Sequence, residues 1–159
     1  MKNEAQFKTA FKKSVRAQGG FSLSLAAPMI SGIPDLYVIM PGYCPLLLEA
    51  KWLGEAPDPF NRKIKYTKLQ QHFLKECCSV KDYTAMGLIG FKQKNKYWCT
   101  ILHPTFTQIN SLCADNYYVC IDKSNSLFDV HQLFSYYPIP RINGAHIDAA
   151  RVAVSGDAP

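Results

Sequence analysis

Two apolar segments joined by a short turn constrain the fold of this chain most strongly. Residues 35–40 (DLYVIM) and 46–52 (LLLEAKW) are rich in leucine, β-branched and aromatic residues, a composition that favours strands. Residues 41–43 (PGY) lie between them, and proline followed by glycine is typical of a turn. The pattern therefore predicts a β-hairpin that buries at least one of its faces.

The second strand of this hairpin carries two charged side chains on one face. Residues two apart on a strand point to the same side, so Glu49 and Lys51 project together. If the hairpin turns symmetrically about Tyr43, Asp35 lies opposite Lys51. Asp35 is then diagonal to Glu49, which lies opposite Tyr37.

Two carboxylates in this relation can bind a hard cation between them. Diagonal side chains lie about 7 to 8 Å apart, and Mg²⁺ takes an octahedron of oxygen ligands that includes water and phosphate. Asp35, Glu49 and the backbone carbonyl of Ala50 are the candidate metal ligands. Lys51 would orient a nucleophilic water or stabilise the transition state of phosphodiester hydrolysis. The alternative is an ordinary hairpin with an ion pair between Asp35 and Lys51 and a solvated Glu49.

An amphipathic helix is expected before the hairpin, over residues 3–18. Phe7, Phe11 and Val15 recur at helical spacing, and two glycines follow as a stop signal. Glu4 lies one turn before Phe7. It is either a first-turn acid favoured by the helix dipole or a group aimed inward at a polar site.

A strand is expected between this helix and the hairpin. Phe21, Leu23 and Leu25 alternate with small residues, which indicates a strand that faces the core with these three side chains. After the hairpin, residues 53–65 form a long polar loop, and loops of this length are usually functional or mobile.

A second helix is expected from Thr67 to about Cys78. Leu69, Phe73 and Cys77 form its predicted inward stripe. The later expected elements are strands over 84–91 and 97–102 joined by a turn at 92–96, a helix over 105–112, a strand over 117–121 and an aromatic patch over 127–137.

The domain organisation follows from these elements. Residues 1–104 are expected to form the core, 105–138 an extension packed on the core or at a dimer interface, and 139–159 a flexible tail. The apolar side chains of the extension are expected to bury themselves on their own domain or at that interface, and they are Phe128, Leu133, Phe134, Tyr136 and Tyr137.

The charge balance favours an anionic partner. The chain of 159 residues has 18 Lys and Arg against 12 Asp and Glu, a formal charge of +6, which suits nucleic acid or an anionic membrane surface. No apolar run approaches the roughly 20 residues of a membrane span. The first residues (MKNEAQFKTAFKK) lack the apolar segment of a signal peptide. We therefore expect a soluble cytoplasmic protein with no membrane partner.

The six cysteines are expected to be free thiols, because the chain shows no secretory signal and has a large core. There is no CxxC pair, and the four histidines do not lie at zinc-ligand spacing from the cysteines. Cys113, Cys120 and His131 would form a zinc site only if the fold happened to bring them together.

The motif around the hairpin resembles a known nuclease signature. The sequence Gly32-Ile33-Pro34-Asp35 is followed fourteen residues later by residues 49–51 (EAK), a pattern that resembles the PD-(D/E)xK motif. The surrounding order of elements is similar to the VRR-NUC and archaeal Holliday junction resolvase branch of that superfamily, which is common in phages. The resemblance covers residues 1 to about 102.

This resemblance implies a fold, an activity and a set of roles. The fold would be α/β, a restriction-endonuclease-like core with a central mixed β-sheet flanked by α-helices. Asp35 and Glu49 would be metal ligands for Mg²⁺ or Mn²⁺, and Lys51 the catalytic lysine. Glu4 would be a further acid of the site and Gln70 a supporting polar residue. The implied activity is endonucleolytic cleavage of branched or structured DNA by a homodimer, in the host cytoplasm if the protein is phage-encoded.

Two further features have competing interpretations. Thr67 and Gln70 have the spacing of a capping box, so Gln70 is either a site residue or a helix cap. The densest basic run contacts the DNA backbone or is a solvated loop, and it consists of Arg62, Lys63, Lys65 and Lys68.

Two other functions remain open on the sequence. One is a non-catalytic module on a nuclease fold that binds nucleic acid or protein, although no residue of the core motif is missing. The other is a nicking, flap or RNA-directed nuclease, which would use the same catalytic set.

Overall fold

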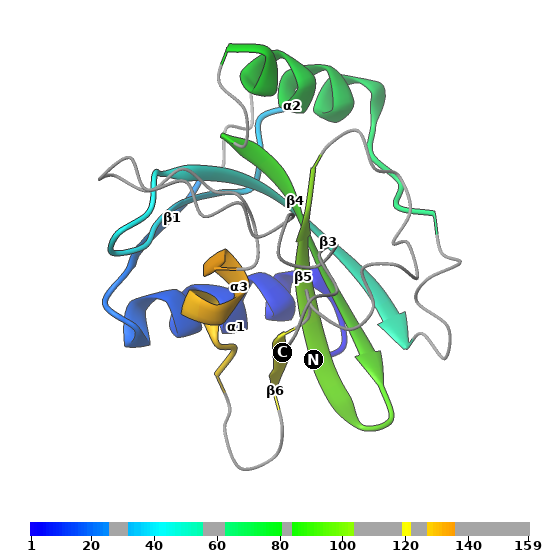
Figure 1. The fold of residues 1–159 in the computed structure, drawn as a ribbon. Coiled ribbons are helices and arrows are strands. Elements are labelled where there is room, and N and C mark those ends of the chain that lie inside the picture. Colours follow the sequence, from blue (N-terminus) through cyan, green and yellow to red (C-terminus); the bar gives the residue numbers. More distant parts are fainter. Residues whose placement is uncertain (26–31, 56–62, 81–83, 104–118, 122–126, 136–159) are drawn as a thin grey trace, which may run out of the picture.

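A computed structural model describes residues 1–25, 32–55, 63–80, 84–103, 119–121 and 127–135 (Figure 1). Its elements in chain order are α1 (Glu4–Ala17), β1 (Phe21–Ser24), β2 (Leu36–Ile39), β3 (Leu46–Glu55), α2 (Lys68–Val80), β4 (Ala85–Gln93), β5 (Lys96–Leu102), β6 (Val119–Ile121) and α3 (Val130–Ser135). The expected helix over 105–112 and the expected tail over 139–159 lie outside the described residues.

The described strands form one mixed sheet in the order β1-β2-β3-β4-β5-β6. β3 and β4 are parallel, and the other neighbouring pairs are antiparallel. A parallel pair needs a crossover connection, and α2 lies in the segment that joins β3 to β4. α1 and α3 lie on one side of the sheet and α2 on the other (Figure 1). The expected fold class, α/β with a central mixed sheet flanked by helices, is confirmed.

The main core lies between α1 and the sheet. Phe7, Phe11 and Val15 are fully buried there, as their helical spacing predicted. Gly90 on β4 permits this packing, because a β-carbon at that position would lie 2.6 Å from the ring of Phe7. Alternate residues of β3, such as Leu48, face the same core. The intervening residues of β3 therefore face the side on which α2 lies.

The predicted facing of β1 is wrong. Phe21 and Leu23 are 53% and 49% exposed, whereas Ser22 between them is 2% exposed. Phe21 pairs across the ladder with Ile39, and Leu23 with Tyr37. The apolar side chains of β1 thus lie beside others on the face away from α1. Period-two alternation identifies a strand but does not say which of its two faces a helix covers.

The predicted inward stripe of α2 is also displaced by one residue. Leu74 and Cys78 are buried, whereas Leu69 is 54% exposed and Phe73 and Cys77 are only partly buried. Both buried side chains share one side of the helix with Gln70, since residues four apart lie on the same face. The buried face of α2 is therefore the one that carries Gln70, whose side chain contacts Glu49 on β3.

The described part of the C-terminal region packs into the main core of its own domain. Phe128, Leu133 and Phe134 are fully buried there. The side chain of Gln18, at the end of α1, donates to the carbonyl of Phe128 (2.6 Å) and accepts from the backbone N–H of Val130 (2.9 Å). These three side chains are thus buried within their own chain. Tyr136 and Tyr137 lie outside the described part.

The described cysteines and helices bear on two further expectations, free thiols and the absence of a membrane span. Among the described side chains, Cys44, Cys77, Cys78 and Cys99 form no disulfide. Cys113 lies outside the described residues, and the side chain of Cys120 is not described. No helix in the described ranges is long and apolar enough to cross a membrane.

Candidate active site

The register of the β2–β3 hairpin differs from the predicted one. Leu36 pairs with Leu48 and Tyr37 with Leu47, so the turn is centred on Gly42. Gly42 has a φ of +83°, a conformation that glycine adopts without strain, and this sets the centre of the turn one residue earlier than Tyr43.

This register changes which charged groups oppose each other. The prediction that Asp35 lies opposite Lys51 and Tyr37 opposite Glu49 is wrong. Continued by one residue, the observed register places Asp35 opposite Glu49. Directly opposed side chains are in general closer than diagonal ones, so the observed register favours a closer approach of the two acids than the predicted register does.

Asp35 lies just before β2, where its carboxylate is held by two donors. Its Oδ2 accepts from the backbone N–H of Ala50 (3.0 Å), and its Oδ1 accepts from the Lys8 ammonium (2.7 Å). β3 runs over ten residues and β2 over only four, so β3 continues past the start of β2. The Asp35 side chain therefore replaces the missing strand as a partner for β3.

Among the described residues of the β2 side, the register places no backbone N–H opposite the carbonyl of Ala50. The N–H and C=O of one strand residue point to the same side, so this carbonyl points where the Asp35 carboxylate lies. The continued register places Pro34 opposite Ala50, and proline has no N–H to donate. The proline of the motif thus leaves a backbone oxygen beside the acid.

Glu49 is the most buried acid of the site, with 2% of its surface exposed. Its Oε1 accepts from the Lys51 ammonium (2.8 Å) and from Nε2 of Gln70 (2.5 Å). Burial raises the pKa of Glu49, and repulsion from Asp35 and Glu4 adds to this, outweighing the hydrogen bond and charge of Lys51. The interpretation of Glu49 as a solvated residue beside an Asp35–Lys51 ion pair is therefore wrong.

Gln70 makes the contacts of a helix cap and also contacts the acid and the lysine of the candidate site. Its Oε1 accepts from the backbone N–H of Thr67 (2.9 Å), and its own N–H donates to Oγ1 of Thr67 (3.1 Å), which completes the capping box. The same Oε1 lies 3.3 Å from the Lys51 ammonium, while Nε2 donates to Glu49. The cap at the start of α2 thus fixes the amide that holds the acid and the lysine.

Lys51 is flanked by an aromatic ring that sequence reasoning missed. Its ammonium lies 5.8 Å from the ring centroid of Tyr66. A β-carbon at Gly87 on β4 would overlap the Tyr66 hydroxyl, so glycine makes room for the ring. Burial, and then the charge of Glu49, raises the pKa of Tyr66, which therefore stays neutral. No short motif points to Tyr66, because its position depends on the path of the loop before α2.

α1 contributes two charged groups to the site. The Lys8 ammonium lies 2.7 Å from Oδ1 of Asp35 and 3.7 Å from Oε1 of Glu4. Burial disfavours the Lys8 charge, but the hydrogen bond and charge of Asp35 outweigh this and raise the pKa of Lys8. Glu4 thus reaches the site through Lys8. The spacing of four residues between Glu4 and Lys8 could have signalled their pairing on one helix face, but not the contact of Lys8 with Asp35.

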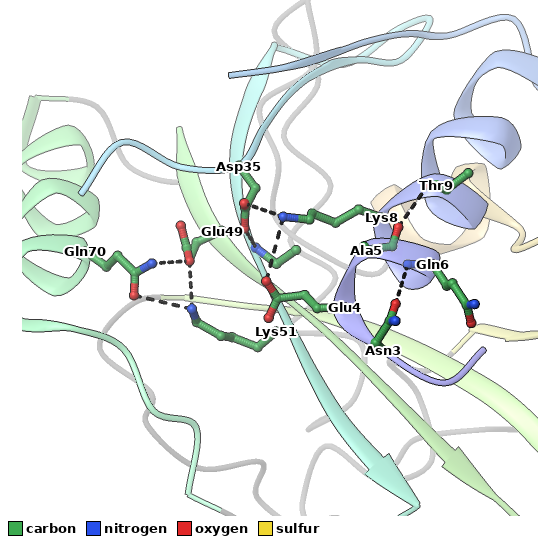
Figure 2. Close-up of polar contacts among 11 residues, drawn as sticks. Asn3, Glu4, Ala5, Gln6, Lys8, Thr9, Asp35, Glu49, Lys51 and Gln70 are labelled. Carbon is green, nitrogen blue, oxygen red and sulfur yellow. Dashed lines mark hydrogen bonds and ion pairs between the residues drawn. The ribbon is translucent and has the colours of Figure 1, made fainter. Parts of the chain in front are cut away.

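Figure 2 shows the resulting arrangement. Asp35, Glu49 and Lys51 lie in the centre, Gln70 approaches from α2 on one side, and Glu4 and Lys8 approach from α1 on the other. The structure therefore brings together the acids, the lysine and the amide that the sequence singled out.

A pocket of about 440 Å³ adjoins this arrangement, and it is lined by Glu4, Lys51, Trp52, Leu53, Lys63 and Lys65. Two members of the predicted basic run, Lys63 and Lys65, thus share a pocket with the central lysine. Lys68, the first residue of α2, is exposed and does not line this pocket. Arg62 lies outside the described residues.

The donor set of the site suits a hard divalent cation. Asp35, Glu49 and the Ala50 carbonyl offer only oxygen, which Mg²⁺ and Mn²⁺ prefer. Within the described ranges, no three His, Cys, Asp or Glu side chains gather closely enough to hold a metal by themselves. A metal held here would therefore need the backbone carbonyl and water as further ligands.

Comparison with solved structures finds a similar fold in Hjc, a Holliday junction resolvase from the archaeal hyperthermophile Archaeoglobus fulgidus. The two chains are 13% identical in sequence, and the match covers 83% of this chain and 99% of the resolvase with a TM-score of 0.46. No protein-family model matches the chain, and no curated protein matches it in sequence. The functional assignment therefore depends on the side chains of the site.

Proposed function

We propose that this chain is a metal-dependent nuclease that hydrolyses phosphodiester bonds in DNA. The observation that carries the proposal is the buried carboxylate of Glu49, held by Lys51 and Gln70 beside the Asp35 carboxylate. A buried acid costs folding free energy unless it is paired. A structural ion pair needs no second acid beside it, whereas two adjacent carboxylates supply the oxygen ligands that a divalent cation prefers.

The roles of the residues follow from their contacts. Asp35, Glu49 and the Ala50 carbonyl would hold Mg²⁺ or Mn²⁺. When bound, such a metal makes water a better nucleophile and offsets the charge that develops on the phosphate. Lys51 holds its ammonium beside the acids and would stabilise that charge or orient the attacking water. Gln70 positions both Glu49 and Lys51, since it contacts each of them.

The pocket beside the site supports an anionic, extended substrate. Lys63 and Lys65 are exposed and line the same pocket as Lys51. Ammonium groups spaced along a pocket contact successive phosphates without reading the base sequence. In this proposal Lys63 and Lys65 position the DNA backbone, and Lys51 acts at the phosphate that is cut.

The finer assignment is supported by the motif resemblance alone. On that basis we propose that the chain belongs to the VRR-NUC and Holliday junction resolvase branch of the PD-(D/E)xK nucleases and acts on branched or structured DNA. A homodimer would then cut two strands. A phage-encoded enzyme of this kind would act in the cytoplasm of the host.

Cleavage of three labelled substrates tests the proposal. A four-way junction, a linear duplex of matching sequence and a single strand are incubated with Mg²⁺ or with EDTA, using the wild type and Lys51→Ala. We expect Mg²⁺-dependent cutting of the junction by the wild type and a loss of at least about a hundredfold in Lys51→Ala. Binding of DNA without cutting of any substrate would instead indicate a non-catalytic binding module. Preferential cutting of another substrate would keep the nuclease but reject the junction.

A further inference from the structure

Lys8 lies where the two carboxylates nearest α1 converge. Its ammonium contacts Asp35 at 2.7 Å and Glu4 at 3.7 Å, and the side chains of all three residues are only partly exposed. Figure 2 shows Lys8 extending from α1 to a point between these two acids. Nothing in the motif requires a lysine at this position.

The contact with Asp35 bears on metal binding. Both oxygens of this carboxylate already accept a hydrogen bond, one from Lys8 and one from the Ala50 N–H. The Ala50 N–H belongs to the sheet and cannot move away. The Lys8 ammonium, in contrast, ends a flexible four-carbon stem and can leave. A divalent cation on Asp35 would also repel an ammonium that stayed within hydrogen-bonding distance of the same carboxylate.

The charges of the cluster lead to the same conclusion. The carboxylates of Glu4, Asp35 and Glu49 face the ammonium groups of Lys8 and Lys51. Three negative and two positive charges leave one net negative charge, which is close to balance without any metal. Departure of Lys8 from Asp35 would leave this acid with a full charge for a cation to neutralise.

We propose that Lys8 is an exchangeable counter-cation of the metal site. It neutralises Asp35 in the metal-free protein and leaves Asp35 when a divalent cation binds, so that metal binding is an exchange of one cation for another. Glu4, one helical turn away, keeps Lys8 near the site after the exchange. This inference rests on the proposed function, because it takes Asp35 as a metal ligand.

Titration of the DNA-free protein with Mn²⁺ by calorimetry tests the exchange. The variants are Lys8→Met and Lys8→Gln, which remove the charge while keeping much of the side chain. The matched control is Lys12→Met, one turn further along α1, where the ammonium donates to Oγ of Ser24 (2.8 Å) and contacts no acid of the site. We expect both Lys8 variants to bind Mn²⁺ about fivefold more tightly than the wild type. This factor corresponds to the upper range of the strength of a partly exposed ion pair, which the metal would no longer have to displace.

Thermal unfolding provides a second readout. In EDTA the Lys8 variants should unfold at a lower temperature than the wild type, because Asp35 loses its partner. Addition of Mn²⁺ should raise the unfolding temperature of the Lys8 variants by more than it raises that of the wild type. Lys12→Met should match the wild type in Mn²⁺ affinity.

Equal or weaker Mn²⁺ binding by both Lys8 variants would overturn the exchange, as would an equal gain in Lys12→Met. If the wild type still cuts DNA with metal in that case, only the role of Lys8 is wrong. If neither the wild type nor the Lys8 variants bind Mn²⁺, the proposed function fails as well.

Discussion

At the scale of single residues, Glu49 combines burial with charge. It is 2% exposed, yet it contacts an ammonium and an amide and lies near two other carboxylates. Such a group favours its protonated form more than an exposed glutamate does. Metal binding requires the ionised form, so Glu49 links pH, stability and metal affinity.

The metal-free protein should therefore lose stability as pH rises through the titration of Glu49. Its pKa in the folded chain is raised above the ordinary value of 4.5, so the folded state holds the proton to a higher pH than the unfolded state. The free energy of unfolding then falls as pH rises from about the ordinary value through the raised one. Urea unfolding in EDTA at several pH values would measure this. Glu49→Gln should remove that part of the slope, and an unchanged slope would show that Glu49 is not responsible.

At the scale of elements, the start of α2 connects helix stability to the site. Gln70 caps the helix with Thr67 and also holds Glu49 and Lys51. Two substitutions separate these functions. Thr67→Ala removes the hydroxyl of the cap but leaves the Gln70 amide in place, whereas Gln70→Ala removes the contacts to the cap and to the site together.

We expect Thr67→Ala to lower the free energy of unfolding by about 1 kcal/mol with little change in cleavage rate. Gln70→Ala should cost about as much stability and should also slow cleavage at least about tenfold, because Lys51 and Glu49 lose a positioning contact. Urea unfolding and single-turnover cleavage of both variants would check this. Equal cleavage rates in the two variants would mean that Gln70 is only a helix cap.

The elements also show what the sequence could predict. The hairpin, the first helix with Phe7 and Phe11 inward, and the shared face of Glu49 and Lys51 follow from local periodicity, and the structure has all of them. The register does not follow, because a turn can be centred on either of two neighbouring residues and only the φ of Gly42 decides. Local periodicity also cannot say which face of a strand a helix will cover. For this reason Phe21 was predicted to face the core, whereas it is exposed.

Contacts between distant segments were the least predictable part of the site. Lys8 and Asp35 are 27 residues apart in sequence. The periodic pattern of apolar residues does not indicate which distant residue a lysine side chain contacts. Tyr66 reaches Lys51 only because Gly87, on a neighbouring strand, leaves space for its ring. Both contacts depend on tertiary packing, so only the structure reveals them.

At the scale of the whole molecule, the formal charge of +6 and the lysines of the pocket should govern DNA affinity. Each ammonium that contacts a phosphate adds about one unit to the slope of log affinity against log salt. We expect Lys63→Ala and Lys65→Ala each to weaken binding of all DNA sequences similarly and to reduce this slope by about one. Anisotropy titrations at several salt concentrations would measure it.

Lys94→Ala is the matched control for this comparison. Lys94 is an exposed lysine in the turn between β4 and β5, and it does not line the pocket. Its removal changes the total charge by the same amount. A slope that falls equally in Lys94→Ala and Lys63→Ala would indicate a general effect of net charge and would contradict a specific contact at the pocket.

The most direct test of the central claim is cleavage by charge-neutral, isosteric variants of the two acids. Asp35→Asn and Glu49→Gln are compared with the wild type on one labelled junction, with increasing Mg²⁺ and with EDTA, after circular dichroism has established that all three proteins are folded. We expect metal-dependent cutting by the wild type and a loss of at least about a thousandfold in each variant, because each loses a charged oxygen ligand. Cutting at the wild-type rate by either folded variant, or cutting by the wild type in EDTA, would contradict a metal site formed by Asp35 and Glu49.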